Sequence, residues 1–110
     1  MVEITVYKTG NHEYVGFDAK GHAGLADVGQ DVLCAAVSMM VINTINSIGR
    51  FTDDETSLVQ DEETGTVEFR FVHVANHDAH LLIQAMLHGL SSLEDNEDYE
   101  PFIDIIYEEV

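Results

Sequence analysis

The stretch from residue 32 to residue 48 constrains the fold more than any other part of the sequence. Apolar side chains recur so densely in it that they would wrap nearly all round a helix. A helix of that kind is buried on more than one side. The chain has only 110 residues, which allows a single domain whose one sheet covers one side. We therefore expect a second copy of the chain, in a homodimer, to cover the other side.

The ends of this helix are predicted from its flanking residues. Asp31 is a suitable N-cap, which would place Cys34 at the third helical position. Gly49 follows Ile48 and is a favourable residue for ending a helix.

Alternating apolar and polar residues predict strands on both sides of the helix. Residues 2–7 and 14–19 alternate around a short turn, which predicts a hairpin. Residues 57–61 and 66–74 predict a second hairpin around a turn at 62–65.

A second helix and a last strand complete the pattern. Asn76 or Asp78 can cap a helix that reaches about Leu93, and residues 102–107 form the final strand. The order ββαββαβ predicts an α+β fold over residues 1–110, with one mostly antiparallel sheet packed against two helices in a single domain.

The charge balance limits the partners of this chain. Twenty-one acidic residues face four Lys and Arg, which gives a net charge of −17. A phosphate backbone would be repelled, so we expect no direct nucleic-acid binding. The acidic surface serves either solubility, including adaptation to salt, or the attraction of a basic partner.

Two further expectations concern the location of the protein. We expect no membrane association, because we find no apolar run of about 18 uncharged residues. The single cysteine excludes an intramolecular disulfide, and a reducing cytoplasm is the simplest compartment for it.

Cys34 and His22 form the pair that points to chemistry. A cysteine in the first turn of a helix ionises easily, because free N–H groups and the helix dipole stabilise its thiolate. His22 lies twelve residues earlier in a glycine-containing stretch and could take the thiol proton, as in a cysteine hydrolase or transferase. The alternative is a small apolar residue in the core, the commoner role of a lone cysteine on an apolar helix.

Asp31 and Ser38 each have two interpretations. Asp31 either caps the helix or orients His22 as the third member of a triad. Ser38 lies one turn beyond Cys34 and either lines a substrate pocket or bonds back to a helix carbonyl.

Gly21, Gly24 and Gly29 frame the segment that precedes the helix. They predict a loop that could cover the site as a lid. No Gly-Lys-Ser/Thr sequence follows them, so a phosphate-binding loop is not indicated.

A rival site is suggested by the histidines near the second helix: His73, His77, His80 and His88. His77 and His80 are three residues apart and could share a face. Neither a second cysteine nor a His-Glu-x-x-His sequence accompanies them, so we expect solvated side chains, no metal and no cofactor.

The residues quoted above carry a resemblance to a known family. Gly-His-Ala at 21–23 and Gly-Gln-Asp-Val-Leu-Cys-Ala-Ala-Val-Ser at 29–38 resemble the signature of the ribosomal-processing cysteine proteases, the Prp family. The element order, the second helix from Asp78 and the acidic loop after it extend the resemblance over nearly the whole chain.

The resemblance implies a function. Members of the family are cysteine endopeptidases that remove a short N-terminal extension from a large-subunit ribosomal protein and so support ribosome assembly. By resemblance, Cys34 is the nucleophile and His22 the general base and proton donor. Asp31 and Ser38 match positions near the site, the segment from His22 to Gly29 matches a lid over the peptide cleft, and the family is homodimeric. The alternative function is a non-catalytic acidic module that binds basic ribosomal or assembly proteins.

Overall fold

Five strands form one sheet in the order β3-β4-β2-β1-β5. The computed structural model describes residues 1–21, 28–61 and 63–110, with the backbone alone for 28–31. The strands are β1 (Val2–Lys8), β2 (Tyr14–Lys20), β3 (Thr56–Asp61), β4 (Thr66–Phe71) and β5 (Ile103–Glu109); the helices are α1 (Val28–Phe51) and α2 (His77–Glu94), with a short 3-10 turn, η1 (Glu100–Phe102).

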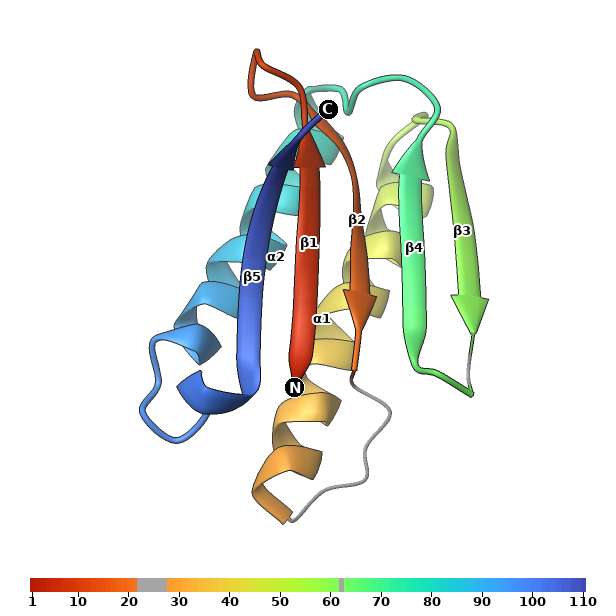
Figure 1. Ribbon diagram of the computed structural model, residues 1–110. Helices are drawn as coiled ribbons and strands as arrows, with labels where there is room; N and C mark the ends of the chain where they lie inside the picture. The colour runs from red at the N-terminus through yellow and green to blue at the C-terminus, as the bar shows by residue number, and fades with distance from the viewer. Residues whose placement is uncertain (22–27, 62) are drawn as a thin grey trace.

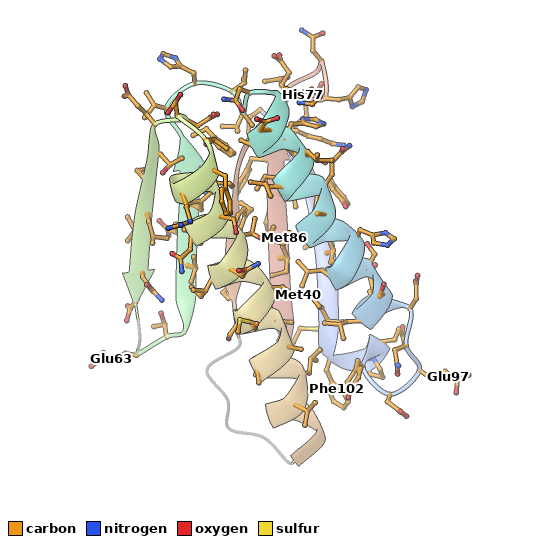
Figure 2. The ribbon with its side chains drawn as sticks, turned by 180° about the vertical axis from the view of Figure 1, so that it is seen from behind. Met40, Glu63, His77, Met86, Glu97 and Phe102 are labelled. Atoms are coloured by element: carbon orange, nitrogen blue, oxygen red, sulfur yellow. The ribbon has the colours of Figure 1, made fainter. Side chains whose placement is uncertain are left out.

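The pairing of the strands confirms the predicted α+β fold. β1 pairs with β2, β2 with β4 and β4 with β3 in antiparallel fashion, whereas β5 lies parallel to β1. Both helices cover the same face of the sheet, as the opposite views in Figures 1 and 2 show. Among the described residues, the other face carries no helix.

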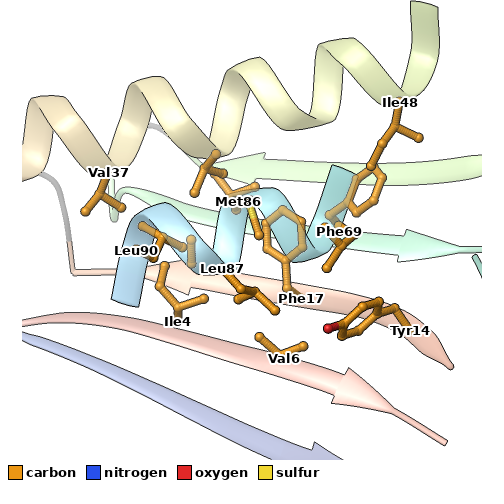
Figure 3. Close-up of a cluster of buried hydrophobic side chains, with 14 of the residues drawn as sticks. Ile4, Val6, Tyr14, Phe17, Val37, Ile48, Phe69, Met86, Leu87 and Leu90 are labelled. Carbon is orange, nitrogen blue, oxygen red and sulfur yellow. The ribbon is translucent and has the colours of Figure 1, made fainter. Parts of the chain in front are cut away.

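The core lies between the sheet and the two helices. Ile4 from β1, Phe17 from the central strand β2 and Leu90 from α2 are fully buried there. The rings of Phe17 and Phe69 lie with their centroids 5.3 Å apart (Figure 3). The alternation that predicted these strands therefore arises because one face of the sheet is buried.

Two strands differ from their predicted bounds by more than one residue. β4 ends at Phe71 instead of residue 74, because the N–H of Ala75 turns to the carbonyl of Tyr14 rather than continuing the ladder. The last strand begins at Ile103 and continues to Glu109, beyond the predicted residue 107. It is prolonged because its whole length pairs with β1.

The start of α2 confirms its predicted cap. Asn76 has an extended backbone, and its side chain accepts a hydrogen bond of 3.0 Å from the N–H of Ala79. This bond satisfies one of the free N–H groups of the first turn.

Both predicted ends of α1 need correction. The helix begins at Val28, so Asp31 lies inside it and is not its N-cap. Adding residues to an existing helix is favourable once the first turn has formed, and the single Gly29 costs only about 1 kcal/mol. The helix also passes Gly49 and ends at Phe51, where the Thr52 hydroxyl and N–H both donate to the carbonyl of Ile48.

The premise of the membrane expectation is also wrong. Val32–Phe51 has a hydropathy of 1.7 and is long and apolar enough to cross a membrane. Of its apolar window, 28% is buried inside the molecule, and the core helix of a soluble protein can meet the same criterion. Val32, Met39 and Phe51 are each more than half exposed, so α1 retains an uncovered apolar surface, as its sequence predicted.

Candidate active site

Cys34 lies at the edge of the buried stripe of α1. Leu33 and Val37 on either side of it in sequence are fully buried, and Val32 is 52% exposed. Cys34 itself is half-buried and packs against the core. The first turns of α1 project beyond the end of the sheet in Figure 1. Part of the surroundings of Cys34 is therefore apolar, and the residue is not fully enclosed by the core.

The earlier start of α1 changes the electrostatics of this cysteine. Cys34 is the seventh residue of the helix and lies in its second turn, not its first. The effect of the helix dipole falls off within the first turn, and the free N–H groups belong to the first four residues, 28–31. The helix N-terminus would therefore stabilise a thiolate at Cys34 less than the sequence suggested.

The other predicted site residues fall into two groups. His22 and Gly24 lie outside the described residues, and only the backbone of Asp31 is described. Ser38 is half-buried, one turn beyond Cys34 on α1. Gly29 belongs to α1 and not to a loop. The predicted loop therefore does not include Gly29.

Gly21 marks the end of β2 and the start of the segment that leads to α1. Its φ is +82°, in the left-handed region that favours glycine. A Cβ at this position would lie 1.9 Å from the carbonyl oxygen of Met1. Gly21 therefore allows the chain to turn away from the sheet. This is a structural role, in addition to its predicted role of framing the segment before the helix.

The few cations of the described chain are largely engaged away from Cys34. Arg70 forms an ion pair of 2.8 Å with Asp18 and lies over the ring of Tyr7; the hydrogen bond and charge of Asp18 raise the pKa of Arg70. Lys8 lies over the ring of Tyr107. The acidic side chains are therefore mostly left without basic partners.

The histidines near α2 do not gather. His80 stacks on Tyr14 with ring centroids 4.6 Å apart, while His77 is 92% exposed and contacts Asp78. Among the described residues, no group of three or more His, Cys, Asp and Glu could hold a metal ion.

A groove between the helices was not predicted. It has a volume of about 210 Å³ and is lined by both helices, with Met40 from α1 and Met86 from α2 near its centre (Figure 2). Gly89 permits the close packing, because a Cβ there would lie 3.1 Å from the sulfur of Met40. A glycine inside the apolar pattern of the second helix was the sequence signal for this approach.

Solved structures with this fold define the class of the protein. The chain superimposes on an essential ribosomal processing protease Prp from Staphylococcus aureus in complex with a covalently linked product peptide, with a TM-score of 0.86 and 26% identity, over 98% of this chain and 100% of that one. The same protease in complex with a substrate peptide gives a TM-score of 0.89 at 25% identity, with the same coverage. The fold, together with the half-buried Cys34 on α1, is that of a cysteine protease.

The sequence comparisons identify the family. The family model described as cysteine protease Prp matches residues 1–104. The ribosomal processing cysteine protease Prp of Staphylococcus aureus is 32% identical over 106 residues, 96% of each chain, and that of Bacillus subtilis is 30% identical over 104 residues, 91% of each. The chain belongs to the Prp family of cysteine proteases, as the resemblance of its motif predicted.

Proposed function

We propose that this protein is an endopeptidase that removes a short N-terminal extension from a large-subunit ribosomal protein. The observation that carries the proposal is the half-buried Cys34 on α1 of a Prp fold. Relatives similar over nearly the whole chain are ribosomal processing proteases. Its net charge of −17 suits a basic ribosomal protein as substrate.

The proposed chemistry uses Cys34 and His22 as a dyad. His22 takes the thiol proton, and the resulting thiolate–imidazolium pair compensates for the distance of Cys34 from the helix N-terminus. A covalently linked product peptide in the Staphylococcus aureus relative supports a covalent route.

The proposed reaction has two stages, acylation of Cys34 and hydrolysis of the resulting thioester. The thiolate of Cys34 attacks the scissile carbonyl carbon and forms a C–S bond. The C–N bond then breaks as the leaving amine takes the proton from the imidazolium of His22, which leaves a thioester. His22 next accepts a proton from water, the hydroxide attacks the thioester, and the C–S bond breaks to release the peptide acid and restore the thiolate.

Asp31 and Ser38 are proposed as supporting residues, and the segment that leads from Gly21 to α1 as the cover of the peptide. Asp31 can no longer serve as the N-cap, because it lies inside α1. This leaves orientation of His22 as its proposed role. A reducing cytoplasm is the proposed compartment, where the single thiol stays active.

Alkylation of Cys34 by iodoacetamide across the pH range tests the dyad. Cys34 is the only cysteine, so the label reports on this residue alone. The ordinary pKa of a cysteine thiol is about 8.5. We expect Cys34 to react rapidly well below this pH, and His22→Ala to lose that reactivity. His88→Ala changes an exposed histidine on α2 and is the matched control. A thiol that reacts only in denaturant would refute the dyad and favour the non-catalytic acidic module.

Cleavage of an N-terminally extended ribosomal protein tests the substrate. Cys34→Ser should fold normally and abolish the cut, and mass spectrometry of the product locates it. If the thiol is reactive but every extended ribosomal protein stays intact, the assignment as a cysteine protease stands and this substrate is excluded.

We also propose that the protein is a homodimer through α1. The support is the exposure of Met39, at 69%, and of Val32, at 52%, on the uncovered side of the helix. Sedimentation should give a dimer for the wild type and a monomer for Met39→Glu, with Met39→Leu as the control that keeps the apolar contact. A monomeric wild type at micromolar concentration would exclude this arrangement.

A further inference from the structure

The outer edge of the sheet at β3 is open along its whole length. Every residue of β3 is exposed. Within the described part of the chain β3 pairs only with β4, in unbroken register from Thr56 opposite Phe71 to Asp61 opposite Thr66. The strand contains no Lys or Pro, the residues that commonly protect such edges. In Figure 1 it forms the side of the sheet opposite β5.

The outward backbone groups of β3 are defined by its pairing. The N–H of Val72 donates to the carbonyl of Glu55 at 2.9 Å, which makes this a hydrogen-bonded pair. Such pairs alternate along an antiparallel ladder, so Thr56, Leu58 and Gln60 direct their N–H and C=O groups away from β4. An extended chain could bond to these three residues.

A hollow lies beside this edge on the sheet face that carries no helix. It has a volume of about 270 Å³ and is lined by Val59, Asp61, Thr64, Thr66 and Glu68. Val59 is 61% exposed and supplies apolar surface, and it lies directly opposite Glu68 in the register. An apolar wall with two carboxylates at its side suits the methylene stem and the cationic head of Lys or Arg.

The acidic residues around β3 determine which kind of segment can pair with its edge. Acidic residues flank β3 at both ends, with Asp53 and Glu55 before it and Asp61 and Glu63 after it. If two copies paired through β3, either orientation would bring these acids together, which is unfavourable. A basic extended segment would meet them with opposite charge.

We propose that the β3 edge and its hollow form a docking site for an extended basic segment of a partner protein. The segment adds a strand to the sheet through the outward groups of Thr56, Leu58 and Gln60, and one of its Lys or Arg side chains enters the hollow beside Glu68. The proposal for this edge does not depend on the proposed dyad.

The test uses the full chain carrying Cys34→Ala, so that a peptide cannot be cut. The probe is the peptide acetyl-Thr-Lys-Val-Lys-Val-Lys-Thr-amide, and binding is followed by calorimetry and by amide NMR. We expect the N–H groups of Thr56, Leu58 and Gln60 to exchange more slowly with solvent when the peptide is bound. The same peptide with Glu in place of Lys, or with N-methylated backbone, should not bind.

Substitutions at the β3 edge distinguish binding through backbone hydrogen bonds from non-specific electrostatic attraction. Leu58→Pro removes an outward N–H without removing a ladder bond, and it should weaken binding by about tenfold. Leu58→Ala keeps the N–H and should bind within about twofold of the parent. Glu68→Gln should weaken the Lys peptide several-fold and reduce the dependence on salt.

Three results would overturn the proposal. They are equal binding of the N-methylated and parent peptides, equal binding of the Lys and Glu peptides, and unchanged exchange at Thr56, Leu58 and Gln60. The exchange measurement needs no substitution in β3, so it decides the question even if Leu58→Pro fails to fold.

Discussion

The carboxylate of Asp54 accepts a hydrogen bond of 3.0 Å from the backbone N–H of Asn76. The bond links the connection between α1 and β3 to the N-cap of α2. It joins two segments that lie 22 residues apart in sequence. The N-cap is therefore held from outside the helix as well as by its own side chain.

Asp54→Ala should lower the free energy of unfolding by about 1 kcal/mol, because it leaves the N–H of Asn76 without this acceptor. Urea unfolding followed by circular dichroism measures the change. Asp53→Ala is the matched control at the exposed neighbour and should stay within about 0.5 kcal/mol of the wild type. Equal losses in both variants would show that the bond contributes nothing specific.

Tyr7 should make stability depend on pH in the alkaline range. Its hydroxyl donates to Asp18 at 2.7 Å, and this bond, burial and the charge of Asp18 raise the pKa of Tyr7 above its ordinary value of 10.0. Because the pKa of Tyr7 is higher in the folded than in the unfolded state, the protonated hydroxyl stabilises the fold at a pH below the unfolded-state pKa. This contribution is lost as the pH rises through the folded-state pKa.

Unfolding of the wild type and of Tyr7→Phe across this range measures the effect. The wild type should be more stable by about 1 kcal/mol near neutral pH, and the difference should shrink above about pH 10. A difference that stays constant into the alkaline range would contradict the role of the hydroxyl.

Gly16→Ala should destabilise the sheet by about 2 kcal/mol. A Cβ at Gly16 would lie 2.2 Å from the carbonyl oxygen of Phe69 and 2.9 Å from the side chain of Arg70, so the two strands would have to move apart. Thermal unfolding measures the loss.

Gly49→Ala is the control for this substitution. No atom lies within 4 Å of a Cβ at Gly49, and the position is exposed inside α1. Alanine favours a helix by about 1 kcal/mol over glycine, so this variant should be more stable than the wild type. Destabilisation by both substitutions would disprove the close contact as the cause at Gly16.

The acidic surface should accelerate cleavage of a basic substrate in a salt-dependent manner. With a net charge of −17, kcat/KM for a basic extended protein should fall several-fold between low and high ionic strength, because screening weakens long-range attraction. A short neutral peptide carrying the same cleavage site should show little change. Rates for both substrates that are flat with salt would exclude electrostatic attraction.

Much of the fold could be read from local patterns. Alternation at residues 2–7 and 14–19 predicted β1 and β2 because each strand buries one face. Asn76 predicted the start of α2, since its side chain bonds within its own first turn. The motif around Cys34 predicted the family for the same reason, because its residues lie close together in sequence.

The remaining features depended on contacts between distant residues. The parallel pairing of β5 with β1 joins the two ends of the chain, and it extended the last strand beyond its predicted end. The bond from Ala75 to Tyr14 ended β4 early. The local sequence of a segment does not show which distant residues it pairs with.

The sequence by itself determined the element types, their order and the presence of a single cysteine on an apolar helix, because these depend on side-chain periodicity and composition. The tertiary structure decided the strand order, the open edge at β3 and the position of Cys34 in the second turn of α1. These features depend on which surfaces meet when the sheet and helices pack, and that choice is made over the whole chain at once.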